Sequence, residues 1–173
     1  MFRFARALPI IAAALIAGPL MHACSEPDTS GDPLIEPARN DPALAAATKQ
    51  AVSTLDVFWS KFDTQAAGTS DYFVKLRMTG QDGYDEYIWA EPVRHSADEV
   101  VARLANDPVH LEGLELGSEV RAPPGEIADW SYTKNSKMYG HFTSRALAKW
   151  ATPEQRAGYD RLLAPTPLEP VTN

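Results

Sequence analysis

Residues 116–150 have the sequence LGSEVRAPPGEIADWSYTKNSKMYGHFTSRALAKW and contain the densest run of turn signals in the chain. A short extended run over 119–122 leads into Pro123-Pro124-Gly125. This tripeptide predicts a tight reversal, because proline fixes φ and glycine adopts conformations that other residues avoid. The stretch indicates how the chain folds, but it does not by itself indicate a reaction.

A hairpin and a helix are predicted to follow this reversal. Residues 127–132 alternate with the period of a strand, the polar residues 134–137 suit a hairpin connection, and 138–140 would form the partner strand. Apolar residues over 142–150 then recur at helical spacing, and Thr143 is expected to cap that helix.

The sequence upstream predicts one long helix and at least two strands. Asp41-Pro42 is typical of a helix start, and the apolar residues that follow keep helical spacing for about six turns, to near Gly68. Strands are predicted at 72–78 and 84–93. Residues 96–106 fit either a helix, which their capping box favours, or a strand.

The C-terminal part of the chain predicts a second helix and a tail. Thr152-Pro153 is a helix start, and Gln155 is placed to complete a capping box, so a helix is expected to about Leu163. The proline-rich residues 165–173 are expected to form a loose tail.

Seven short sequence blocks occur in the order and spacing that characterise a bacterial family. They are 58–59, 73–76, 86–89, 104–108, 117–120, 127–130 and 139–145. The chain resembles the YegJ-like domain of unknown function 2314 family over about residues 43–150. Two positions depart from the pattern, since Tyr87 stands where a His is common and His141 where a Gly is common. A chemical role of that first His, if the family has one, would be lost here. The resemblance implies that 96–106 is a strand, and it implies no activity.

These patterns predict an α+β fold. An antiparallel sheet of about five strands would be covered on one face by a long N-terminal helix and one or two C-terminal helices. The expected organisation is a signal peptide at 1–23, a lipidation cysteine and disordered tether at 24–41, a single domain at 42–164, and a loose tail at 165–173.

The N-terminus is predicted to direct export. Arg3 and Arg6 precede an apolar run over 8–20 that is too short to span a bilayer comfortably. Cys24 is the only cysteine, and Met21-His22-Ala23-Cys24 resembles a bacterial lipobox. We therefore expect Cys24 to carry a lipid anchor and the domain to face the periplasm. Cleavage by the ordinary signal peptidase and an uncleaved anchor are the alternatives.

The charge of the chain restricts its partners. The formal net charge is −7, and it becomes more negative without the two leader arginines. An acidic surface argues against nucleic acid, and also against electrostatic docking on anionic lipid.

The residues around Trp130 are candidates for ligand binding. In one interpretation, Asp129, Trp130, Tyr132, His141 and Arg145 line a groove in which the indole stacks on a ligand. In the other, which we favour, Trp130 fills the core and Asp129 accepts backbone N–H bonds at the hairpin or pairs with Arg145. On that interpretation Trp130→Ala is severely destabilising and Asp129→Asn is milder.

Evidence in the sequence for catalysis is weak. Asp129, His141 and Ser144 come from one short region and could serve a hydrolase that acts on an envelope substrate. His95, His110 and His141 are scattered without metal-ligand spacing, so no metal or cofactor is predicted. The preferred prediction is a non-enzymatic envelope module that binds a protein or a cell-wall component.

Overall fold

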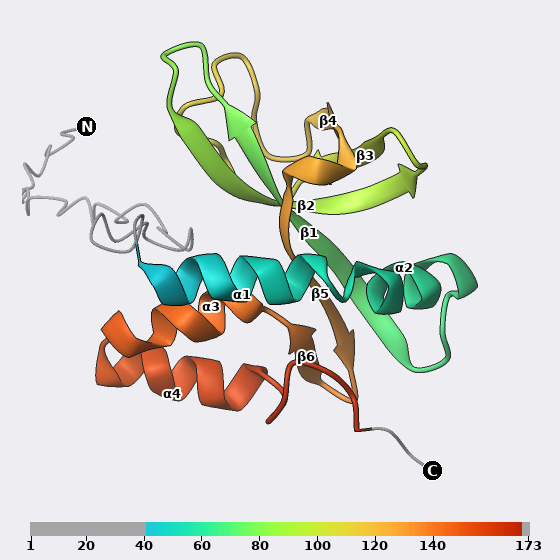
Figure 1. Cartoon of the computed structure of the whole chain (residues 1–173), viewed down its shortest axis with the longest axis vertical. Coiled ribbons are helices and arrows are strands. Elements are labelled where there is room, and N and C mark those ends of the chain that lie inside the picture. Colours follow the sequence, from blue (N-terminus) through green and yellow to red (C-terminus); the bar gives the residue numbers. More distant parts are fainter. Residues whose placement is uncertain (1–40, 171–173) are drawn as a thin grey trace, which may run out of the picture. The chain divides into compact units, whose positions relative to one another are not determined.

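The computed structural model describes residues 41–170. The predicted signal peptide, Cys24 and nearly all of the predicted tether lie outside these residues, as does the end of the tail at 171–173. Within 41–170 the protein is α+β, as predicted, with an antiparallel sheet and four α-helices (Figure 1). No helix in this part combines the length and apolar character of a membrane span.

The sheet has six strands in the described residues, where about five were predicted. In spatial order they are β4 (Glu119–Ala122), β3 (Val100–Leu104), β2 (Asp85–His95), β1 (Thr69–Thr79), β5 (Ile127–Lys134) and β6 (Lys137–Gly140). Strand β3 confirms the strand interpretation of 96–106. The capping-box residues form the turn before β3, where Ser96 Oγ accepts a hydrogen bond from Glu99 N at 3.1 Å.

The helices are α1 (Pro42–Val52), α2 (Leu55–Thr64), α3 (Phe142–Leu147) and α4 (Pro153–Leu162), with short 3₁₀ turns at Pro124–Glu126 and Ala148–Trp150. The predicted helix starts are confirmed at α1, where Asp41 caps Ala43 N, and at α4, which has the complete capping box. Helices α1, α2 and α3 contact β5, and α4 contacts β6.

The predicted long N-terminal helix is two helices, because the chain breaks after Val52. An unbroken helix would direct the Ala51 carbonyl to the N–H of Leu55. That carbonyl instead accepts Thr54 N at 3.1 Å and the indole Nε1 of Trp130 at 2.9 Å. A contact with a distant strand, which helical periodicity does not report, therefore ends α1.

Two rows of side chains cross the centre of the sheet, one on each face. Strand partners share a face, so Val74 of β1 lies beside Trp130 of β5, and Phe58 of α2 packs on Trp130 with ring centroids 5.7 Å apart. This row belongs to the main hydrophobic core. The opposite row aligns Lys75 of β1 with Trp89 of β2 and Asp129 of β5.

The described part of the predicted tail is bound to the domain. Gly140 N donates to Pro167 O at 2.8 Å, and the Glu169 carboxylate contacts Lys61, Lys134 and the Tyr132 hydroxyl. Residues 165–170 therefore form an ordered extension beside β6. Proline content alone does not predict whether such a segment packs on the domain.

Candidate functional site

Asp129 is a buried carboxylate that caps α3 from a neighbouring strand. Its Oδ1 accepts the N–H of Phe142 at 3.2 Å, and its Oδ2 accepts the N–H and hydroxyl of Thr143 at 2.7 and 2.6 Å. The residue before α3, His141, adopts a left-handed conformation and provides no side-chain cap. The prediction that Thr143 caps this helix is therefore wrong. Thr143 lies inside the first turn, where it donates to the true cap.

Asp129 accepts backbone N–H bonds, as the favoured interpretation predicts, but its main donors lie in α3 and not in the hairpin as predicted. Burial raises the pKa of Asp129, while the Thr143 hydrogen bonds and the charge of Lys75 act in the opposite direction. Lys75 Nζ is 3.3 Å from Thr143 Oγ1 and 4.9 Å from the centroid of the Trp89 ring. The alternative partner, Arg145, instead donates its Nε to Gly140 O at 2.9 Å.

The proposed groove does not form around Asp129 and Trp130. Successive residues of a strand point to opposite faces, so the two side chains lie on different sides of the sheet. Trp130 and Tyr132 have no exposed surface and belong to the core. His141 and Arg145 are partly exposed, so they are the members of the predicted set that can meet a ligand at the surface.

The residues of the hydrolase hypothesis come together only in part. His141 Nδ1 lies 3.3 Å from Ser144 Oγ, and the His141 ring is 4.8 Å from the Trp89 ring. Both oxygens of Asp129 are occupied by backbone N–H groups and Thr143, so this carboxylate serves α3. Ser144 is buried, with 3% of its surface exposed.

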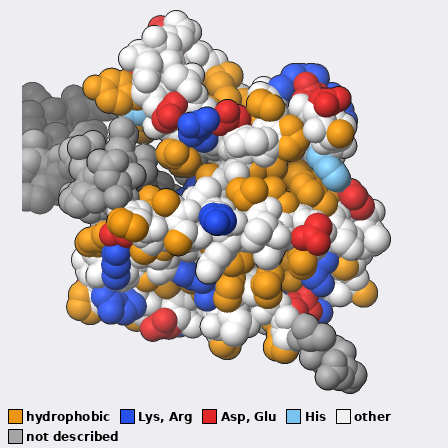
Figure 2. Space-filling model, viewed as in Figure 1, with side chains coloured by type: hydrophobic (Ala, Val, Ile, Leu, Met, Phe, Trp, Pro, Cys, Tyr) orange, Lys and Arg blue, Asp and Glu red, His pale blue; other side chains and the backbone are white. Residues whose placement is uncertain are grey.

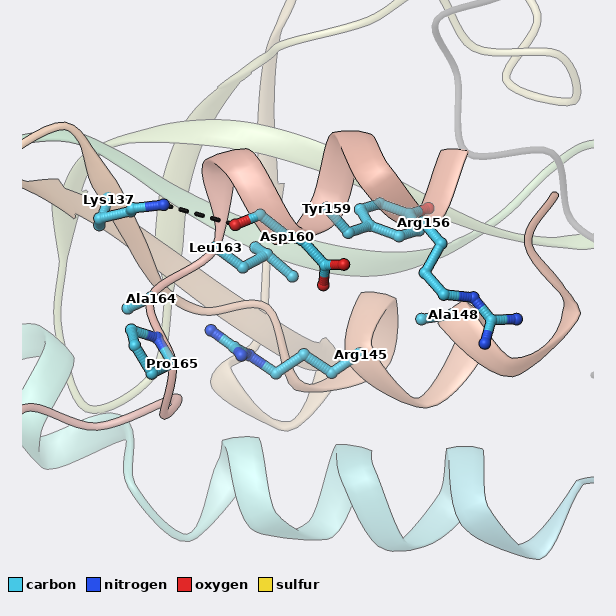
Figure 3. A pocket seen from close by; sticks show the side chains of 9 residues that line it. All are labelled: Lys137, Arg145, Ala148, Arg156, Tyr159, Asp160, Leu163, Ala164 and Pro165. Carbon is cyan, nitrogen blue, oxygen red and sulfur yellow. Dashed lines mark hydrogen bonds between the residues drawn. The ribbon is translucent and has the colours of Figure 1, made fainter. Parts of the chain in front are cut away.

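A pocket of about 320 Å³ lies between α3, α4 and β6 (Figure 3). Figure 3 shows Arg145 extending from α3 into this space, the Asp160 carboxylate turned toward it from α4, and Arg156 at the other end. Apolar and small residues complete the lining. The full set is Lys137, Arg145, Ala148, Arg156, Tyr159, Asp160, Leu163, Ala164 and Pro165.

The three cations of this pocket face backbone carbonyls, two of them at normal hydrogen-bond distance. Lys137 Nζ donates to Arg161 O at 2.6 Å, and Arg145 Nε donates to Gly140 O. Arg156 Nη2 approaches Ala151 O at 3.5 Å. Within residues 41–170 none of the three forms an ion pair with a carboxylate. Burial lowers the pKa of Arg145, so an incoming anion would offset an existing desolvation cost.

Basic side chains are visible over this end of an otherwise acidic chain. Figure 2 shows a group of Lys and Arg side chains over α3 and α4 on the face in view. Sequence reasoning identified Arg145 but missed Lys137, Arg156 and Asp160. Each lies in a polar segment, and only the packing of α4 against β6 and α3 brings them together. The described residues contain no group of three or more His, Cys, Asp or Glu that could hold a metal ion.

Comparison with known proteins identifies the family to which the sequence belongs. The chain is 30% identical over 112 residues to the uncharacterized protein YegJ of Escherichia coli, covering 65% of this chain and 71% of that protein. It is 27% identical over 127 residues to a putative ankyrin repeat protein of Neisseria meningitidis. This match covers 69% of this chain and 50% of that protein. No solved structure matches. Residues 41–164 match the family described as uncharacterized protein conserved in bacteria (DUF2314), and the chain belongs to that family.

Proposed function

We propose that the protein is an exported, lipid-anchored envelope protein whose folded domain binds a ligand or partner without catalysing a reaction. The observation that carries the non-catalytic part is the use of Asp129. A carboxylate beside a His and a Ser is a candidate for chemistry, but here it is buried as a helix cap. The cationic residues around Arg145, in contrast, line an open pocket. The envelope part rests on the leader and on Cys24.

The anchor is tested by fractionating bacteria that express the full chain. Lipid chains contribute roughly 0.8 kcal/mol per buried methylene, so the parent should be found in the membrane fraction and Cys24→Ser in the soluble periplasmic fraction. Ser30→Ala, a neutral change in the same predicted tether, is the matched control and should fractionate with the parent. Membrane association of a Cys24→Ser protein that has lost its leader, equal to that of the parent, would refute lipidation at this residue.

A hydrolase is the second candidate, and the contact between His141 and Ser144 favours it. A serine activated by a histidine should react with a fluorophosphonate probe. We expect the purified parent to remain unlabelled, because Ser144 is buried and Asp129 serves α3. Labelling of the parent that disappears in Ser144→Ala would overturn the non-catalytic proposal.

A further inference from the structure

We propose that the pocket between α3, α4 and β6 binds a small zwitterion, with its carboxylate at Arg145 and its amino group at Asp160. Free amino acids and short peptides belong to this chemical class. The inference deepens the proposed binding function and rests on it, because it names the site and the ligand chemistry. Neither the family nor the relatives assign this pocket a role.

Arg145 provides the anion-binding element. Its Nε donates to Gly140 O at 2.9 Å and its Nη2 approaches Met138 O at 3.5 Å, so two backbone carbonyls orient the guanidinium. Its Nη1 makes no hydrogen bond to the described residues. A fixed guanidinium fork matches the geometry of a carboxylate, and such charge-assisted bonds are about twice as strong as neutral ones.

Asp160 selects the charge of the ligand. Its carboxylate faces the same space as Arg145 and Arg156 (Figure 3). A phosphate dianion would be repelled by this negative charge more strongly than a carboxylate monoanion would. An ammonium group on the ligand would turn the same charge into an attraction. A zwitterion uses both the cations of the pocket and the Asp160 carboxylate, whereas a phosphate leaves the Asp160 charge without an attractive partner on the ligand.

The walls and the size of the pocket limit the body of the ligand. Ala148, Leu163, Ala164 and Pro165 provide an apolar lining that suits a short aliphatic side chain. A volume of about 320 Å³ is at the lower end of the range for small-molecule sites. An amino acid or a dipeptide with small side chains fits both features.

Calorimetric titration of the full chain, purified in detergent, tests the ligand class. The probes are L-alanine and L-alanyl-L-alanine, which carry both charges, N-acetyl-alanine and alaninamide, which lack one charge each, and inorganic phosphate. We expect one of the zwitterions to bind at least about tenfold more tightly than any other type of probe. Alanine and its dipeptide distinguish a free amino acid from a peptide as the source of the carboxylate.

Single substitutions assign the binding to this pocket. Arg145→Gln should weaken the best zwitterion on the order of tenfold, and Asp160→Asn should abolish its advantage over N-acetyl-alanine. Arg161→Gln, an exposed substitution on α4 outside the pocket lining, is the matched control and should bind as the parent does. If Arg145→Gln does not fold, the exposed Asp160→Asn variant decides the question.

Three results would overturn the inference. They are no binding of any zwitterion at about 10 mM, tighter binding of phosphate than of alanine, or equal weakening by Arg161→Gln and Asp160→Asn. Each leaves the anchoring test on Cys24 unaffected, so the proposed envelope binding function could still hold with another partner. A Cys24→Ser protein that stays on the membrane would refute the anchor and leave the calorimetry valid.

Discussion

Replacing Asp129 by asparagine tests whether α3 depends on a cap supplied by strand β5. The substitution keeps the size and one acceptor oxygen but turns the other oxygen into a donor. In the structure both oxygens face donors, with Phe142 N at Oδ1 and Thr143 N at Oδ2. Trp130 N also donates to Oδ1, at 2.8 Å. Either orientation of the amide therefore places an NH₂ group against at least one buried N–H.

The cost can be worked out for the better orientation. With the amide nitrogen at the Oδ2 position, the Thr143 hydroxyl can rotate to accept from it, but Thr143 N–H loses its acceptor. A buried N–H without a partner costs about 1–3 kcal/mol, and a lost hydrogen bond to a charged group adds about 1.5 kcal/mol or more. We expect Asp129→Asn to reduce the free energy of unfolding by roughly 2.5–4.5 kcal/mol. This cost comes close to that of Trp130→Ala, so we expect a smaller difference between the two substitutions than the sequence alone indicates.

Denaturant unfolding followed by circular dichroism measures this cost. Asp98→Asn makes the same chemical change at an exposed site and should alter the free energy of unfolding by less than about 0.5 kcal/mol. In the double variant with Thr143→Ala, the two effects should not be additive, since the residues share hydrogen bonds. If Asp129→Asn is as stable as Asp98→Asn, the carboxylate is not the cap that the reasoning requires.

Three further predictions concern the core, the tail and a close backbone approach. Trp130→Ala should cost about 3–5 kcal/mol, and Trp130→Phe clearly less, because the smaller ring keeps most of the packing; equal melting temperatures of Trp130→Ala and the parent would contradict a core role. Burial would raise the pKa of Glu169, but hydrogen bonds led by Lys134 outweigh it and hold the pKa at about 2. Because this pKa lies below its unfolded value, the ionised Glu169 should stabilise the fold by about 1–2 kcal/mol above pH 4.5. This contribution should be lost as the pH falls toward 2. Melting curves at a series of pH values should show that Glu169→Gln removes this part of the pH dependence. Gly140→Ala should reduce the free energy of unfolding by more than about 2 kcal/mol, since the φ of Gly140 is +75° and a Cβ would lie 2.1 Å from Trp130 O. Gly158→Ala, on the open surface of α4, is the control and should raise the free energy of unfolding by about 0.5–1 kcal/mol. A similar change for both variants would refute the close approach.

Local patterns predicted the hairpin well because its determinants are local. Asn135 and Ser136 both have positive φ, which is the backbone of a two-residue turn that joins twisted strands. The polar residues 134–137 and the alternation before them identify this turn without any knowledge of distant contacts. The start of α4 was predictable for the same reason, since its capping box is complete within four residues.

The features that local patterns missed or left open depend on residues far apart in the sequence. Helix α1 ends where Trp130 takes the Ala51 carbonyl, across 79 positions. The Ser96 capping box suggested a helix, but pairing of β3 with β2 and β4 overrides that local preference. The cationic pocket was missed for the same reason, because Arg156 and Asp160 acquire a common environment with Arg145 only when α4 packs on the domain.

The cap on α3 also links the stability of the domain to the proposed ligand site. Helix α3 has only six residues, so it depends on tertiary contacts, and Asp129 satisfies its first donors. Arg145 lies on the same short helix, one turn away from the cap. Loss of the cap should therefore displace the guanidinium as well as destabilise the core. We expect Asp129→Asn to reduce zwitterion binding and stability together, whereas Asp160→Asn should reduce binding alone. Calorimetry and unfolding of both variants would show whether binding and stability change separately. The reasoning fails if Asp160→Asn binds as the parent does and Asp129→Asn loses stability but not binding. In that case Asp129 holds α3 in place, but α3 does not present a ligand site.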